Sequence, residues 1–170
     1  MPASKLRQWY DEKNRWVERH PKPWDEATER EYHATFTDPF EEWLDQGMGS
    51  CLLKDAENAR IVADALLFFC GKRYELATFT VMPSHVHVLF SPRGGHSIKD
   101  ILKSWKGFTA HEINKRMGTH GALWQEECWD RLVRNEKHYF MCADYIRKNP
   151  DKAGLKEGFL TWDRGTRRLM

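Results

Sequence analysis

The chain has 170 residues, of which 41% are hydrophobic and 31% charged, so it is long enough to build its own core. Its net charge of +2 excludes a bulk polycation, although the segment from Lys99 to Arg116 and the tail after Lys152 are basic. With no secretory leader, no apolar run of membrane-spanning length and four widely spaced cysteines, the sequence predicts a cytoplasmic protein with reduced thiols, without a membrane partner or a cysteine zinc site.

The first part of the chain has the spacing of amphipathic helices. Residues 4–20 form one predicted helix, which two prolines end. Asp25 can cap a second helix, and Asp38 can cap a third with Pro39 at its first position. Asp55 begins a fourth, which ends near Gly71. We expect residues 1–70 to be a helical region that serves packing.

The period then changes from helical to alternating. Residues 74–82 are rich in β-branched and aromatic side chains and predict a strand, which a short turn connects to a second strand, antiparallel to it. His85 and His87 are two residues apart in that second strand, so both side chains lie on the same face. Two neighbouring imidazoles form half of a metal site, or they are simply two histidines on a half-exposed sheet.

Two more helices are predicted toward the C-terminus. Ser97 with Asp100 begins one that continues to about Met117. Residues 121–133 are expected to include a strand. Asn135 can cap a last helix, which covers residues 136–148, with Pro150 forcing its end.

The last helix carries the second half of the candidate site. Tyr145 and Asn149 are four residues apart and therefore share one helix face. A phenol can act as a nucleophile, and an amide oxygen is a hard ligand that suits Mg²⁺ or Mn²⁺. Because Asn149 precedes Pro150, we expect it at a frayed helix end, free to reach across. The alternatives are a packed tyrosine and an ordinary helix cap.

Several motifs, in this order, resemble the single-tyrosine HUH transposases and most of all the REP-associated tyrosine transposases. The motifs are Met82-Pro83-Ser84-His85-Val86-His87, Ser104-Trp105-Lys106, Trp124-Gln125, Asp144-Tyr145-Ile146-Arg147-Lys148-Asn149-Pro150 and Lys152-Ala153-Gly154-Leu155. The resemblance covers residues 72–155. It implies an α+β fold, with a ferredoxin-like antiparallel sheet that has helices on one face and the histidine pair on a central strand. We expect a single domain over residues 1–170, made of the helical N-terminal region, this core and a basic tail at 156–170.

The resemblance also implies a role for each candidate residue. His85, His87 and Asn149 would hold Mg²⁺ or Mn²⁺, and Tyr145 would cleave and rejoin single-stranded DNA through a 5′-phosphotyrosine. The DNA would be a hairpin or a palindrome, and the relatives include monomers and homodimers. Candidates for phosphate contacts are Lys103, Lys106, Arg131, Arg134 and Arg147.

Two features depart from the family pattern. Ser84 stands where the family most often has asparagine, and the chain begins in a helix where the family has a first strand. Residues 159–162 are apolar and can replace that strand. The missing strand favours an alternative function, a domesticated protein that binds a nucleic-acid hairpin with little or no cleavage. A third reading, a histidine-nucleophile phosphoesterase, needs another alternating histidine where this chain has Leu89.

Overall fold

The computed structural model describes residues 3–45, 50–125, 128 and 130–165, and the chain divides into two compact units, Met1–Gly49 and Ser50–Met170. Whereas the sequence places residues up to 70 in a helical N-terminal region, the helix α4 (Ala56–Phe68) belongs to the second unit. The last five residues of the expected basic tail lie outside the described residues.

The first unit consists of helices packed through aromatic side chains. They are α1 (Ala3–Arg19), α2 (Glu26–Tyr32), a π-helical turn (His33–Thr37) and α3 (Asp38–Asp45). Trp16, Phe36 and Phe40 are buried; the Phe36 ring contacts Trp16 and Trp9, and the Phe40 ring contacts Trp9. These aromatic residues therefore form a core, as the sequence predicts.

The expected break before Pro39 is absent. Asp25 caps α2 by accepting a hydrogen bond from the Thr28 amide at 2.8 Å, as predicted. Asp38 is not a cap, because its dihedral angles are helical and its amide donates to the His33 carbonyl. The π turn ends at Thr37, directly before α3, and accommodates Pro39 in the first turn of that helix, where the proline cannot donate a helical hydrogen bond. The backbone is therefore helical from α2 to the end of α3.

The second unit is an α+β structure, which confirms the predicted fold class. It contains α4, β1 (Tyr74–Val81), β2 (Val86–Pro92), α5 (Ile98–Met117), α6 (Glu136–Lys152) and β3 (Leu160–Asp163), and a 3₁₀ turn (Leu52–Lys54) precedes α4. The predicted caps of the three helices are confirmed, since the side chains of Asp55, Ser97 and Asn135 each accept a hydrogen bond from the first turn of their helix. Within the described part of residues 121–133 the expected strand is absent.

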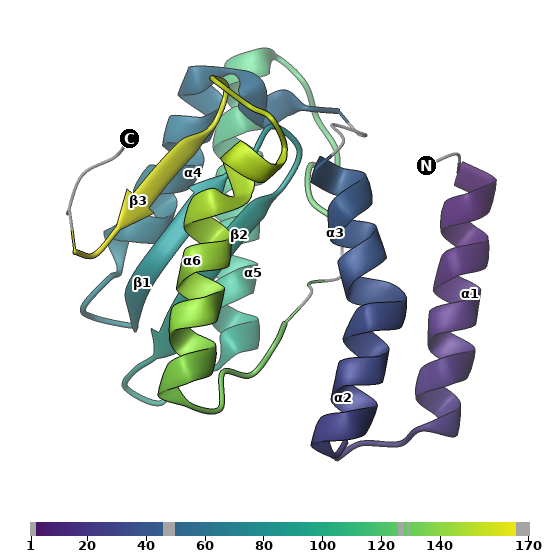
Figure 1. Cartoon of the computed structure of the whole chain (residues 1–170). Coiled ribbons are helices and arrows are strands. Elements are labelled where there is room, and N and C mark those ends of the chain that lie inside the picture. The colour runs from purple at the N-terminus through teal and green to yellow at the C-terminus, as the bar shows by residue number, and fades with distance from the viewer. Residues whose placement is uncertain (1–2, 46–49, 126–127, 129, 166–170) are drawn as a thin grey trace. The chain divides into compact units, whose positions relative to one another are not determined.

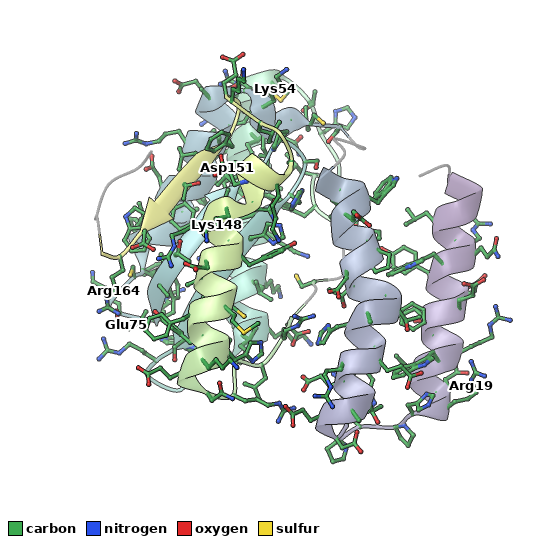
Figure 2. The ribbon with its side chains drawn as sticks, viewed as in Figure 1. Arg19, Lys54, Glu75, Lys148, Asp151 and Arg164 are labelled. Atoms are coloured by element: carbon green, nitrogen blue, oxygen red, sulfur yellow. The ribbon has the colours of Figure 1, made fainter. Side chains whose placement is uncertain are left out.

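The three strands form one antiparallel sheet in the order β2-β1-β3. The apolar segment that the sequence offers as a replacement for the family's first strand does form a strand: β3 pairs with β1, with Trp162 opposite Phe79. Beside this pairing, Arg164 reaches Glu75 at 3.1 Å (Figure 2). The histidine strand β2 is an edge strand of the described sheet, not the central strand that the resemblance implies.

A β-bulge decides which side chains of β1 face which helices. The register shifts between Leu76 and Thr78, so one extra residue enters β1. Tyr74 and Leu76 before the bulge, and Phe79 and Val81 after it, all join the core cluster with residues of α4 and α5. Thr78 and Thr80 point to the opposite face.

The helices cover both faces of this sheet, whereas the sequence predicts helices on one face. In Figure 1, α6 lies in front of the sheet, with α4 and α5 behind it. Helix α6 packs against the polar face of β1, where the Thr80 hydroxyl donates to the backbone carbonyl of Ile146 in α6. Among the described helices, none is long and apolar enough to cross a membrane.

Candidate active site

The start of β2 brings the two histidines together. Nε2 of His85 lies 3.0 Å from Nε2 of His87, and the rings are perpendicular. Oγ of Ser84 lies 3.1 Å from Nδ1 of His85, so the residue that departs from the family pattern still holds the outer nitrogen of the ring. Such a contact orients an imidazole so that its other nitrogen faces the site. Both histidines are half-buried.

Helix α6 continues past the point where the sequence predicts its end. It runs to Lys152 with Pro150 inside it. Pro150 has no N–H for the carbonyl of Ile146, and the Thr80 hydroxyl donates to that oxygen instead, at 2.9 Å. The Thr161 hydroxyl of β3, 3.0 Å from Thr80, donates in turn, because the proton of Thr80 is already used. A strand hydroxyl thus replaces the missing helical donor.

This extension changes the position of Asn149. The sequence predicts Asn149 at a frayed helix end, whereas in the structure it is fully buried within the helix. Its Nδ2 lies 3.1 Å from Nε2 of His87. Its Oδ1 is buried and accepts no hydrogen bond from any part of the chain that the structure describes. Asn149 therefore meets His87 because α6 packs on the sheet.

The three side chains fit a divalent cation. Nε2 of His87 lies about 3 Å from Nε2 of His85 and from the Asn149 amide. Two ligand atoms that each lie about 2.1 Å from one ion, at right angles to each other, are also about 3 Å apart. Rotating the Asn149 amide by half a turn would direct its unsatisfied oxygen toward His87. Among the described residues no group of three His, Cys, Asp or Glu side chains could hold a metal, so this set depends on the amide.

Tyr145 lies beside the same histidine. Its ring centroid is 5.6 Å from that of His87, and the ring planes meet at 87°. The ammonium of Lys152 lies 4.2 Å from the centroid of the Tyr145 ring. The structure therefore brings together all four residues that the sequence predicts for metal binding and catalysis, from β2 and α6.

The five predicted phosphate contacts are spread over three segments. Arg147 donates to Asp163 at 2.8 Å and to Asp144 at 2.6 Å, and so links α6 to β3. The hydrogen bond to Asp144 raises the pKa of Arg147 and lowers the pKa of Asp144 from their ordinary values. Lys106 donates to the backbone carbonyl of Gln125 at 2.6 Å. The other three are exposed: Lys103 on α5, and Arg131 and Arg134 in the segment before α6.

Two residues near the site are missed by the sequence interpretation. Thr80 shows no signal of its own, because its acceptor lies 66 residues away. Lys152 follows Tyr145 by seven residues, which places the two on one face of a helix. The sequence predicts that the helix ends at Lys148, so the spacing of Tyr145 and Lys152 does not by itself predict a contact between them.

Comparisons with known proteins agree with the motifs. Residues 64–148, half of the chain, match the family model described as "Transposase IS200 like". Over 93 residues the chain is 30% identical to the REP-associated tyrosine transposase of Escherichia coli (strain K12), a match that covers 52% of each protein. The match thus spans about half the length of that curated relative. No solved structure matches the chain. The matched family segment contains His85, His87 and Tyr145, and the chain belongs to the IS200-like transposases.

Proposed function

We propose that this transposase-family protein is a metal-dependent endonuclease and strand transferase of single-stranded DNA, with Tyr145 as nucleophile. The observation that carries the proposal is the contact of both His85 and Asn149 with Nε2 of His87, with Tyr145 against the same histidine. The name of the Escherichia coli relative, a REP-associated tyrosine transposase, supports a tyrosine as the reacting group.

The proposed reaction exchanges one phosphoester for another. The Tyr145 oxygen forms a bond to phosphorus, and the bond from phosphorus to the 3′ oxygen breaks. The phenol gives its proton to solvent and the 3′ oxygen takes one up, which leaves a 5′-phosphotyrosine and a free 3′-OH. Because the number of phosphoester bonds is unchanged, a 3′-OH can reverse the step without another energy source.

The side chains around Tyr145 have distinct parts in this scheme. His85, His87 and Asn149 would hold a Mg²⁺ or Mn²⁺ ion, which supplies neutralisation of the charge on the non-bridging phosphate oxygens. Ser84 holds His85 through Nδ1, and the Thr80 hydroxyl donates to the carbonyl that Pro150, next to Asn149, leaves without a helical donor. The His87 ring meets the Tyr145 ring and limits where the phenol can lie.

A DNA hairpin is the substrate that we propose. The predicted phosphate contacts Lys103, Arg131 and Arg134 have exposed side chains on the same unit as Tyr145. Contacts of this kind make binding depend on salt and position the strand without reading its sequence.

The test uses a pool of labelled single-stranded hairpins, incubated with the protein and Mn²⁺ and separated on denaturing gels. A protein–DNA adduct is expected from the unaltered chain and is absent from Tyr145→Phe, which loses only the phenolic oxygen. Tyr139→Phe is the matched control, because Tyr139 is an exposed tyrosine of the same helix. Salt-sensitive hairpin binding without any adduct would refute the nuclease and indicate a hairpin-binding protein.

A further inference from the structure

The helix that carries Tyr145 also carries a cation placed on its ring. Lys152 follows Tyr145 by two helical turns, and its Nζ lies 4.2 Å from the ring centroid. A cation at this distance from the face of a phenol ring is attracted by the ring's negative face. The contact exists because α6 passes through Pro150, which the Thr80 hydroxyl makes possible.

The other basic side chains at this end of α6 are directed to carboxylates. Arg147 bonds to Asp144 and Asp163, and Lys148 lies 3.7 Å from Asp144. Figure 2 shows Lys148 on α6, and its side chain is 67% exposed. Lys152 thus differs from its neighbours in contacting the predicted nucleophile, and a general attraction of α6 for DNA does not explain that contact.

We infer that Lys152 is a positioning residue that fixes the ring of Tyr145 for attack on the scissile phosphate. The inference rests on the proposed function. The His87 ring meets the phenol ring nearly at right angles, and the Lys152 ammonium attracts its face. These two contacts, one from β2 and one from α6, restrict the two torsion angles of the tyrosine side chain. The phenolic oxygen then spends more time where it can attack in line.

The first test compares rates of adduct formation at saturating hairpin and Mn²⁺. Lys152→Met keeps the length of the side chain and removes its charge, and it should slow adduct formation about three- to tenfold. Lys152→Arg should restore most of the rate, because a guanidinium also stacks on an aromatic face. Hairpin affinity at fixed salt should change less than about twofold in both variants, because the expected loss lies in positioning and not in binding.

Lys148→Met is the matched control. It removes one exposed cation from the same helix and leaves the Tyr145 ring contact in place. If a general attraction of the helix for DNA caused the effect of Lys152→Met, the rate of adduct formation would fall by the same factor in Lys148→Met. Equal losses, or an unchanged rate in Lys152→Met, would overturn the inference. Absence of an adduct from the unaltered chain would instead overturn the proposed function, and this inference with it.

A second readout needs no reaction. The chain has five tyrosines, so 3-fluorotyrosine labelling gives few fluorine resonances, and Tyr145→Phe identifies the one from position 145. In Lys152→Met that resonance should shift, and in Lys152→Arg it should shift less, because the arginine keeps a charge near the ring. A resonance identical in the unaltered chain and Lys152→Met would show that the ammonium does not hold the ring, and would overturn the inference independently of cleavage.

Discussion

The hydroxyl of Thr80 replaces the backbone donor that Pro150 lacks, and removing it should weaken the attachment of α6 to the sheet. Thr80 is fully buried and lies opposite His87 in the β1–β2 register. Thr80→Val keeps the shape of the side chain and leaves the buried carbonyl of Ile146 without its hydrogen bond. The variant should therefore lose both stability and the alignment of α6 with the histidine strand.

The expected cost follows from the unsatisfied carbonyl. A buried acceptor left without its partner costs about 1–3 kcal/mol, so Thr80→Val should lower the free energy of unfolding by about 2 kcal/mol. Pro150→Ala supplies an amide that can donate to the Ile146 carbonyl in the ordinary helical way. In that background the cost of Thr80→Val should fall by about 1 kcal/mol or more, which is the coupling between two residues that serve one acceptor.

The assay is urea unfolding of the four chains of this double-mutant cycle, followed by circular dichroism and fitted with separate transitions for the two units. Thr78→Val is the control: Thr78 is also fully buried, and its hydroxyl donates at 2.8 Å to the carbonyl of Trp162. Its cost should be the same with proline or alanine at position 150. The reasoning fails if Thr80→Val costs the same in both backgrounds.

Three further predictions concern the metal, acid stability and DNA contacts. Mn²⁺ at about one hundred times its dissociation constant should stabilise the protein by about 2.7 kcal/mol, and equal stabilisation of His87→Ala in thermal melts would exclude these ligands. The backbone N–H of Asn58 donates to the Asp55 carboxylate and lowers its pKa below the ordinary 3.8. Ionised Asp55 therefore stabilises the fold at pH values above 3.8, and this stabilisation is lost as the pH falls through the lowered pKa. Asp55→Asn should accordingly melt lower than the unaltered chain at pH 7, and the difference should shrink in acid; a constant difference would contradict the assignment. Arg134→Ala should weaken hairpin binding and reduce its salt slope by about one, and an unchanged slope in a salt titration would remove Arg134 from the phosphate contacts.

The parts of the fold set by local chemistry could be predicted from the sequence. The caps at Asp55, Ser97 and Asn135 each act within one helical turn, and all three are present. The alternation of His85 and His87 likewise places both on one face, and their Nε2 atoms meet. The short apolar segment near the C-terminus does form a strand, which pairs with β1.

The features that sequence could not predict depend on distant partners or on irregular backbone. Pro150 is a reliable end of a helix when only its neighbours are considered, but Thr80 supplies the missing donor from another element. The bulge after Leu76 exchanges the faces of β1 without a glycine or proline to mark it. The π turn similarly carries the helix past Asp38 and Pro39. In the first two cases the exception also positions the candidate site.

The central claim is that Tyr145 becomes linked to the 5′ side of the cleaved phosphate. The most direct measurement uses one hairpin that forms an adduct, prepared in two versions that carry a fluorophore at the 3′ or the 5′ end. After denaturation and proteolysis, mass spectrometry should find the nucleotide on the peptide that contains Tyr145. The 3′ fluorophore should stay with the protein and the 5′ fluorophore should leave on a fragment with a free 3′-OH. Retention of the 5′ fluorophore, or attachment at any other residue, would contradict the account.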